Sequence, residues 1–254
     1  MAYLDKHSTK PSGEMEENDF RQKTETIQAR IVELKDKLYA QKQQSLLIIV
    51  QGMDSSGKDG VTEAALGKCS PLGVHVMGYK KPTPDEFAHD FLWRIHPHTP
   101  AKGEVAVFVR SHYEDVLIQK VHKWITEDKC KNRYEAINAF EKNLQNDANT
   151  TVVKLFLHIS KEKQLEKLEE RITDPTKYWK HNDSDWDERE LWNEYMKAYD
   201  DVFEKCNQPE WHIIPADKRW YRNYCAAKVV LEALEKMSPQ YPPLISERFG
   251  KDKK

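Results

Sequence analysis

The stretch LLIIVQGMDSSGKDG, residues 46–60, decides the fold of this chain. It starts with five consecutive apolar residues, as expected for a strand that is buried on both faces, and parallel sheets consist of such strands. A glycine-rich turn follows at once. Gly52, four intervening residues, Gly57 and Lys58 have the spacing of a phosphate-binding P-loop, a motif that lies between a strand and a helix. The stretch therefore predicts an α/β domain that binds phosphate groups.

The residue types of this loop suit phosphate binding. Glycines let backbone N–H groups point at phosphate oxygens, the following helix presents its positive N-terminal end, and the Lys58 ammonium adds a mobile charge. The loop positions expected to contact phosphate are Gly52, Ser55, Ser56, Gly57, Asp59 and Gly60.

Two acidic residues depart from the usual loop. Asp54 lies inside it, where phosphates repel a carboxylate unless a divalent cation screens the charge. Asp54 is therefore predicted to ligate or position Mg²⁺, or to accept a proton during transfer. Asp59 stands where a Ser or Thr usually holds magnesium. An acid in the first turn of a helix, favoured by the helix dipole, explains Asp59 equally well.

Strand and helix patterns alternate along the rest of the chain. Apolar stretches at 74–79, 105–109, 152–159 and 211–214 predict further strands. Helices are predicted from residue 20 and around 59–69, 84–95, 112–126, 133–147, 161–172, 186–206 and 220–237. This alternation indicates a doubly wound parallel sheet in a single domain, residues 20–238. The polar, aperiodic residues 1–19 are expected to form a flexible arm, and residues 239–254, which contain prolines, an extended tail.

Composition excludes several functional classes. The chain has 254 residues, and its 40 Lys and Arg against 42 Asp and Glu give a formal charge of −2, which argues against wholesale nucleic-acid binding. No apolar run approaches the roughly 18 residues of a membrane span. The four cysteines form no CxxC pair and no zinc spacing, so free thiols in a reducing cytoplasm are expected.

A second group of polar residues follows the predicted strand at 105–109. The carboxyl ends of parallel strands are where α/β proteins bind ligands, and the first residue there is Arg110, which suits a bidentate clamp on a phosphoryl group. Glu114 and Asp115 either orient Mg²⁺ or the phosphoryl acceptor, or cap a helix. Lys81, after the strand at 74–79, is expected to line the same phosphate channel.

A third group is cationic and lies in the segment 171–190, where Pro175 interrupts a helix. Its members are Arg171, Lys177, Lys180 and Arg189. Several cations on a broken helix favour a mobile lid over a polyanion. Because six acidic residues are interspersed among them, a solvated helical face is the alternative interpretation.

Several separated motifs occur in an order that is specific for one family. They are GMDSSGKDG (52–60), KKPTPDEFAHDFLWRIH (80–96), FVRSHYEDVL (108–117), RITDPTKYWK (171–180) with DERELWNEYMKAYD (187–200), and IPADKRWYRNY (214–224). Over roughly residues 20–245 the chain resembles the polyphosphate kinase 2 family. The resemblance implies a three-layer, thymidylate-kinase-like P-loop kinase fold with a helical lid. It also implies transfer of a phosphoryl group between inorganic polyphosphate and a nucleotide, with Mg²⁺ as cofactor and Mn²⁺ as its substitute, in homo-oligomers that are dimers or tetramers.

The resemblance also implies roles for single residues. By motif match, Asp54, Lys58 and Arg110 are the catalytic residues, and the four cations of the 171–190 segment hold polyphosphate. The SHYED form of the third motif is similar to the subgroup that phosphorylates both AMP and ADP to give ATP, and Glu114 would help to distinguish these acceptors.

Three hypotheses follow. The first is a polyphosphate:nucleotide phosphotransferase that acts on AMP and ADP, with no nucleic-acid or membrane partner. The second is an ATP-dependent nucleotide or nucleoside kinase on the same P-loop fold, which would ignore polyphosphate. The third is a nucleotide-dependent or polyphosphate-dependent switch without useful turnover, and it would leave Asp54 and the lid cations without a role.

Overall fold

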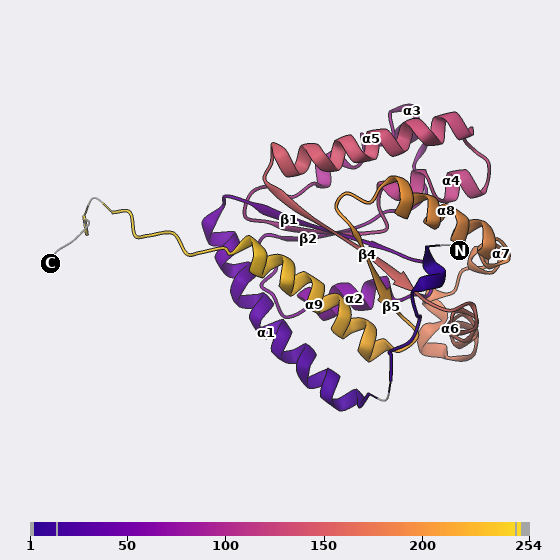
Figure 1. Ribbon diagram of the computed structural model, residues 1–254, viewed down its shortest axis with the longest axis horizontal. Coiled ribbons are helices and arrows are strands. Elements are labelled where there is room, and N and C mark those ends of the chain that lie inside the picture. Colours follow the sequence, from indigo (N-terminus) through magenta and orange to yellow (C-terminus); the bar gives the residue numbers. More distant parts are fainter. Residues whose placement is uncertain (1–2, 14, 247, 250–254) are drawn as a thin grey trace.

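Five strands form one parallel sheet at the centre of the chain (Figure 1). The computed structural model describes residues 3–13, 15–246 and 248–249. The strands are β1 (Ser45–Gln51), β2 (Val74–Gly78), β3 (Val105–Val109), β4 (Thr150–His158) and β5 (Trp211–Pro215), in the order β2-β3-β1-β4-β5. Every pairing is parallel, and all seven residues of β1 are buried. All five predicted strands are confirmed within two residues at each end.

Helices cover both faces of the sheet (Figure 1). One face carries α1 (Glu17–Gln41), α2 (Lys58–Leu66) and α9 (Arg219–Met237), and the other carries α5 (Glu127–Asn146) and α8 (Trp192–Lys205). The apolar stripe predicted for the first helix is confirmed, since Ile31, Leu34 and Leu38 are buried. The predicted three-layer α/β fold of P-loop kinases is therefore confirmed.

Eight further helices occur in the described part of the chain. They are η1 (Leu4–Lys6), α3 (Pro84–Ala88), η2 (His96–His98), η3 (His112–Asp115), α4 (Ile118–Val121), α6 (Lys161–Thr173), η4 (Pro175–Lys180) and α7 (Ser184–Glu190). In the described part of the chain, no helix combines the length and the apolar character that crossing a membrane requires.

Four predicted helices are wrong in extent. The helix expected at 84–95 ends at Ala88, because the Asp90 carboxylate accepts a local hydrogen bond from the Leu92 N–H that competes with the helix. The helix expected at 112–126 is split into η3 and α4. The helix expected at 133–147 is α5, which begins six residues earlier, because the Thr126 side chain caps it there. The helix expected at 186–206 is divided into α7 and α8 at Leu191.

The beginning of the chain packs against the domain. Leu4 is buried, the Tyr3 ring lies 5.2 Å from the Phe203 ring, and the Thr9 hydroxyl donates to Asp217 over 2.9 Å. The described residues at this end therefore contact α8 and the segment before α9, where an unpacked arm was expected. At the other end, residues 239–246 have no regular structure and extend away from the body (Figure 1), as predicted for the tail. The domain boundaries at residues 20 and 238 stay predictions.

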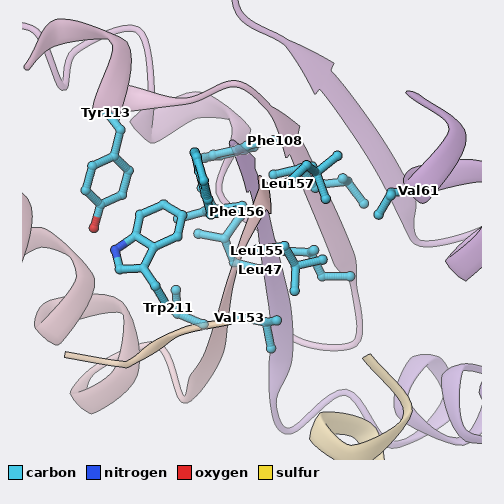
Figure 2. Packing of buried hydrophobic residues seen from close by; sticks show 14 of the residues in the cluster. Leu47, Val61, Phe108, Tyr113, Val153, Leu155, Phe156, Leu157 and Trp211 are labelled. Atoms are coloured by element: carbon cyan, nitrogen blue, oxygen red, sulfur yellow. The ribbon is translucent and has the colours of Figure 1, made fainter. Parts of the chain in front are cut away.

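The core lies between the sheet and the helices on both of its faces. Side chains of the central strands, among them Leu47, Phe108 and Phe156, meet there, and the Tyr113 and Trp211 rings lie beside them (Figure 2). These two rings contact edge to face, with centroids 4.9 Å apart. This packing fixes the segment after β3, which carries Tyr113, against β5.

A fully buried polar network also holds this segment. The Glu141 carboxylate on α5 accepts hydrogen bonds from the Tyr113 hydroxyl over 2.8 Å and from Lys154 Nζ over 2.9 Å. His112 Nε2 lies 3.2 Å from the same carboxylate, and Lys154 also donates to the Cys206 carbonyl. Burial alone would raise the pKa of Glu141, but the contacts with His112 and Lys154 hold it below its usual range. The network joins α5, β4 and the end of α8 to the segment after β3.

Replacing Lys154 by Met should destabilise the protein strongly. The change leaves the Glu141 carboxylate buried without its cation, and breaking a buried pair in this way costs about 3–5 kcal/mol. Urea unfolding of both proteins measures the difference in free energy. The control is Lys228→Met, which removes an exposed ion pair with Glu232 and should change stability by less than about 0.5 kcal/mol. A loss of less than about 1 kcal/mol in Lys154→Met would contradict the role given to the network.

Candidate active site

The sheet topology creates a crevice at the carboxyl ends of β1 and β3. The two strands are neighbours, yet the chain leaves β1 toward β2 and leaves β3 toward β4, in opposite directions. Ligands of open α/β sheets bind at such a switch point. A cavity of about 420 Å³ opens there, and its walls are the loop after β1, the segments after β2 and β3, α4 with the loop after it, and residues of α7 and α8.

The loop after β1 has the backbone that phosphate binding requires. Gly52, Ser55 and Gly57 have φ angles of 149°, 65° and 94°, in or near the left-handed region that glycine tolerates best. A Cβ atom on Gly52 would lie 2.9 Å from the Leu157 carbonyl of β4, so only glycine fits there. Gly57 is the N-cap of α2, which places the positive end of that helix at the loop.

Lys58 closes the loop from inside. Its buried ammonium donates to the carbonyls of Gly52 and Met53 over 2.8 and 3.1 Å and lies 4.0 Å from Asp54 Oδ1. Burial and the neighbouring Arg110 lower the pKa of Lys58 to about 8, although Asp54 acts in the opposite direction. A phosphate oxygen offers this ammonium a stronger partner than the two carbonyls, because it carries ionic charge whereas a carbonyl oxygen carries only a partial charge.

Asp54 and Arg110 form an ion pair across the crevice. Arg110 Nη2 donates to Asp54 Oδ1 over 2.5 Å. Burial would raise the pKa of Asp54, but Lys58 and Arg110 hold it below its usual range, so the carboxylate is ionised at neutral pH. Arg110 has a φ of 61°, an unfavourable value for a residue with a side chain, and such strain is concentrated at functional sites. The structure thus brings together the three residues predicted as catalytic.

The two acids after β3 have different surroundings. Glu114 lines the cavity, and its burial raises its pKa against the opposing effect of Arg110 and Lys58. Asp115 is buried, and its two carboxylate oxygens accept hydrogen bonds from Arg94 over 3.1 Å and from Gln119 over 2.5 Å. Both acids line the cavity, and Asp115 in addition positions Arg94.

Arg94 is a cavity residue that the sequence reasoning missed. Besides the Asp115 contact, its guanidinium donates to the Lys80 carbonyl over 2.9 Å, and its side chain lines the cavity. The sequence signal was its position inside the KKPTPDEFAHDFLWRIH motif, but no periodicity or spacing marked it. Lys81 lines the same cavity, as expected for a channel residue.

The cations predicted for the lid fall into two groups. Arg171 pairs with Asp185, a cavity residue, and Arg189 donates to Gln164, whose amide in turn donates to the Asp54 carbonyl. These two arginines therefore adjoin the loop. Lys177 pairs with Asp174 and Glu170, and the Lys180 ammonium lies 4.9 Å from the Trp179 ring. In this arrangement neither lysine lines the cavity.

Asp59 is exposed in the first turn of α2. This position agrees with the interpretation as an acid favoured by the helix dipole. Gly60, Ser55 and Ser56 lie in or beside the loop, and the hydroxyls of both serines are buried without a hydrogen-bond partner in the described part of the chain. Unpartnered buried hydroxyls at this place are available to phosphate oxygens.

Arg222 of α9 is the second functional candidate that the sequence reasoning did not single out. The buried guanidinium donates to the Ser56 carbonyl over 3.1 Å and lies beside Gly57 of the loop. Burial, with a smaller effect of Arg219, lowers the pKa of Arg222 to about 10. No carboxylate of the described residues forms an ion pair with it within 4.0 Å. Its positive charge therefore adds to the potential that phosphate groups meet at the loop.

Comparisons with known proteins agree with this geometry. Residues 14–242 match the family model of polyphosphate kinase 2. The chain belongs to the polyphosphate kinase 2 family. It is 40% identical over 218 residues to the AMP/ADP-polyphosphate phosphotransferase of Meiothermus ruber, an alignment that covers 85% of this chain and 81% of that protein. It is 35% identical over 227 residues to the ADP-polyphosphate phosphotransferase of Rhodopseudomonas palustris, covering 84% and 78%.

A solved structure of the family has the same fold. The crystal structure of polyphosphate kinase 2 from Arthrobacter aurescens TC1 superposes with a TM-score of 0.89 at 39% identity, over 96% of this chain and 88% of that one. As a member of the polyphosphate kinase 2 family, the protein is a phosphotransferase enzyme. Phosphoryl transfer by such enzymes generally uses a divalent metal ion.

Replacing Gly57 by Ala should destabilise the protein because of Arg222. A Cβ atom at this position would lie 1.7 Å from Arg222 Nη1, so the loop or the arginine must move. The control is Gly13→Ala, since Gly13 also has a positive φ, 82°, but no atom within 4 Å of an added Cβ. Both variants have a strained backbone, and only Gly57→Ala has the clash.

In urea unfolding, Gly57→Ala should lower the free energy of unfolding by about 1–3 kcal/mol more than Gly13→Ala does, which is the usual cost of overpacking. The double variant Gly57→Ala with Arg222→Ala should recover part of this difference, because the clashing group is gone. Equal losses in the two glycine variants would contradict the contact.

Proposed function

We propose that this protein transfers a phosphoryl group from inorganic polyphosphate to AMP and to ADP, forming ADP and ATP, in a reversible reaction. The observation that carries the proposal is the cluster of Asp54, Lys58 and Arg110, which meets a phosphate-binding loop at one end of a cavity. In the same cavity, Lys81 and Arg94 supply positive charge for a second phosphorylated molecule. The name of the Meiothermus ruber relative, AMP/ADP-polyphosphate phosphotransferase, supports this assignment.

The position of each residue in the site indicates its proposed role. The backbone N–H groups of the loop and the N-terminus of α2 bind the donor phosphates, assisted by the hydroxyls of Ser55 and Ser56. Lys58 and Arg110 stabilise the charge that spreads over the oxygens of the transferring group. Asp54 holds Arg110 in place, and Glu114, whose pKa is raised by burial, lines the cavity beside them.

Mg²⁺, or Mn²⁺ in its place, is the proposed metal cofactor. Among the described residues, no group of three or more His, Cys, Asp or Glu is arranged to hold a metal ion by itself. This donor set fits Mg²⁺ nonetheless, because that ion is usually held by one or two carboxylates together with substrate phosphates and water. Asp54 is the carboxylate that would hold it. When bound, the ion neutralises charge on the phosphate oxygens.

The remaining predicted residues belong to the polyphosphate side. Arg171 and Arg189, next to the loop, are proposed to hold the polyphosphate chain, and Lys177 and Lys180 to join them when the lid moves. We further propose a homo-oligomer in the cytoplasm, and the four free cysteines of the described structure suit a reducing compartment.

Nucleotide chromatography tests the function directly. Purified protein is incubated with polyphosphate, Mg²⁺ and either AMP or ADP, with no nucleoside triphosphate present at the start, and a parallel sample contains EDTA. ATP from both acceptors, absent in the EDTA sample, is the expected result. ATP from ADP alone would remove the AMP assignment. No product from either acceptor would overturn the proposal and favour an ATP-dependent kinase or a binding switch.

Replacing Lys58 by Ala should lower turnover by at least ~10²-fold, because the variant loses a main stabiliser of transition-state charge. The measurement is the initial rate of ATP formation from ADP and polyphosphate. Lys68→Ala is the control, since Lys68 is exposed just beyond the same helix. Turnover of Lys58→Ala within a few-fold of wild type would remove Lys58 from the catalytic residues.

Polyphosphate affinity should fall as the pH rises above about 8. The pKa of Lys58 is lowered to about 8, so in the free protein its ammonium is charged below this pH and neutral above it. Polyphosphate binding should therefore weaken by up to about tenfold for each pH unit above 8. Titration calorimetry with long-chain polyphosphate from pH 7 to 9.5 measures this dependence. Lys58→Met should bind weakly with a flat profile over that range. A flat profile in the wild type would contradict the assignment.

A further inference from the structure

The last residue of β1 places a polar side chain inside the sheet. Gln51 is completely buried and directly follows the apolar run 46–50. Its amide Nε2 donates to the Ser111 hydroxyl over 3.1 Å, but its Oε1 is buried with no hydrogen-bond partner in the described part of the chain. Burying an amide oxygen without a partner destabilises a fold, so an apolar side chain would suit this end of the strand better. The stability of the sheet therefore does not explain a glutamine here.

The other polar side chain of β1 has no such imbalance. Ser45, the first residue of the strand, is also buried, and its hydroxyl lies 2.9 Å from the Thr150 hydroxyl on β4. The two hydroxyls satisfy each other at the end of the sheet away from the cavity. Within β1, the unpartnered oxygen thus lies at the end that leads into the phosphate-binding loop.

The contact of Gln51 lies directly beside Arg110. Ser111 follows Arg110 in the chain, and its hydroxyl accepts a hydrogen bond from the Tyr113 N–H over 3.2 Å in addition to that from Gln51. On the other side, the Arg110 N–H donates to the Val50 carbonyl over 3.0 Å. The last two residues of β1 therefore hold the chain both before and after the Arg110 side chain.

The backbone of Arg110 depends on such restraint. A residue with a side chain seldom adopts a left-handed φ, here 61°, and it stays there only where the surrounding contacts over-determine it. From this backbone the guanidinium crosses to Asp54, with Nη2 2.5 Å from Oδ1. If Ser111 lost its contact with β1, Arg110 would relax toward an extended conformation, which directs its side chain elsewhere.

We infer that Gln51 is a positioning residue for phosphoryl transfer. Through Ser111, its amide keeps Arg110 in the left-handed conformation from which the guanidinium reaches Asp54 and the transferring group. The unpartnered Oε1 accompanies this role, because the donor that holds Ser111 is an amide and brings its oxygen into the sheet. This inference rests on the proposed function, in which Arg110 stabilises the transferring phosphoryl group.

A second contact of Gln51 supplies the alternative route. Burial raises the pKa of Glu114, and a hydrogen bond with Gln51 is among the contacts that oppose this rise. A variant of Gln51 could therefore lose activity through Glu114. The two routes differ in one respect: an effect that passes through Arg110 disappears when the guanidinium is removed, and an effect through Glu114 persists.

The test is a double-mutant cycle on kcat for ATP formation from ADP and polyphosphate. Gln51→Met, which removes the amide at similar volume, should lower kcat at least about tenfold, with the KM for ADP within about twofold of wild type. Arg110→Ala should lower kcat by about 10²-fold, and adding Gln51→Met to it should lower kcat by less than about twofold more. An unchanged kcat in Gln51→Met would overturn the inference. Losses that multiply in the double variant would do the same and indicate the route through Glu114.

Stability separates positioning from a purely structural role. Gln51→Met buries no unpartnered oxygen, so its midpoint of urea unfolding should equal or exceed that of the wild type. The control is Ser45→Ala, which breaks the buried hydrogen bond at the other end of the same strand. It should lower the midpoint and leave kcat unchanged. A midpoint of Gln51→Met below that of Ser45→Ala would overturn the inference.

Binding of inorganic tripolyphosphate to the same four proteins of the cycle needs no turnover and keeps the two proposals apart. In titration calorimetry, Gln51→Met should weaken binding at least about fivefold in the wild-type background and less than about twofold in the Arg110→Ala background. If the wild type makes no ATP from polyphosphate but shows this pattern, the positioning role is supported and the proposed donor is rejected. If ATP forms and the losses multiply in both assays, the proposed function stands and the positioning role is rejected.

Discussion

In the register of β1 and β3, Val50 lies opposite Val109, and the backbone N–H of Arg110 donates to the Val50 carbonyl over 3.0 Å. This pairing sets the distance between the two loops that leave the sheet. Asp54 lies in the loop after β1, four residues beyond Val50, and Arg110 directly follows Val109, the last residue of β3. Their side chains therefore meet at the carboxyl edge of the sheet. A shift of register by one residue would turn every side chain of the shifted strand to the opposite face, so the pairing of β1 with β3 is needed for Arg110 to meet Asp54.

The charges of the site balance one another before a substrate is bound. Asp54 offsets Arg110 and Lys58, and Lys58 satisfies its remaining donors on the carbonyls of the loop. Each of these groups is partly or wholly buried, where an isolated charge would be costly. Without a substrate, Asp54 and the loop carbonyls are the partners of Lys58 and Arg110. When a substrate binds, its anionic phosphates become additional partners of the same two cations.

Buried polar groups also support the site. Glu141 and Lys154 hold the segment after β3, Asp115 holds Arg94, and Arg222 lies beside Gly57 of the phosphate-binding loop. These groups lie on elements that are far apart along the chain. Removing one of them would disturb the position of a cavity residue that it supports, because protein interiors are close-packed and transmit small displacements.

The sequence by itself determined the sheet, the phosphate-binding loop and the residues at the ends of β1 and β3. These features depend on local patterns: apolar runs for buried strands, glycine spacing for the loop with Asp54 and Lys58, and position directly after a strand for Arg110. Only the tertiary structure revealed the contacts of Asp115, Arg94 and Arg222. Asp115 and Arg94 are 21 residues apart, and Arg222 lies 166 residues from the Ser56 carbonyl that it contacts. A contact between such distant residues leaves no periodicity or spacing in the chain, because it exists only after the sheet has brought their segments together.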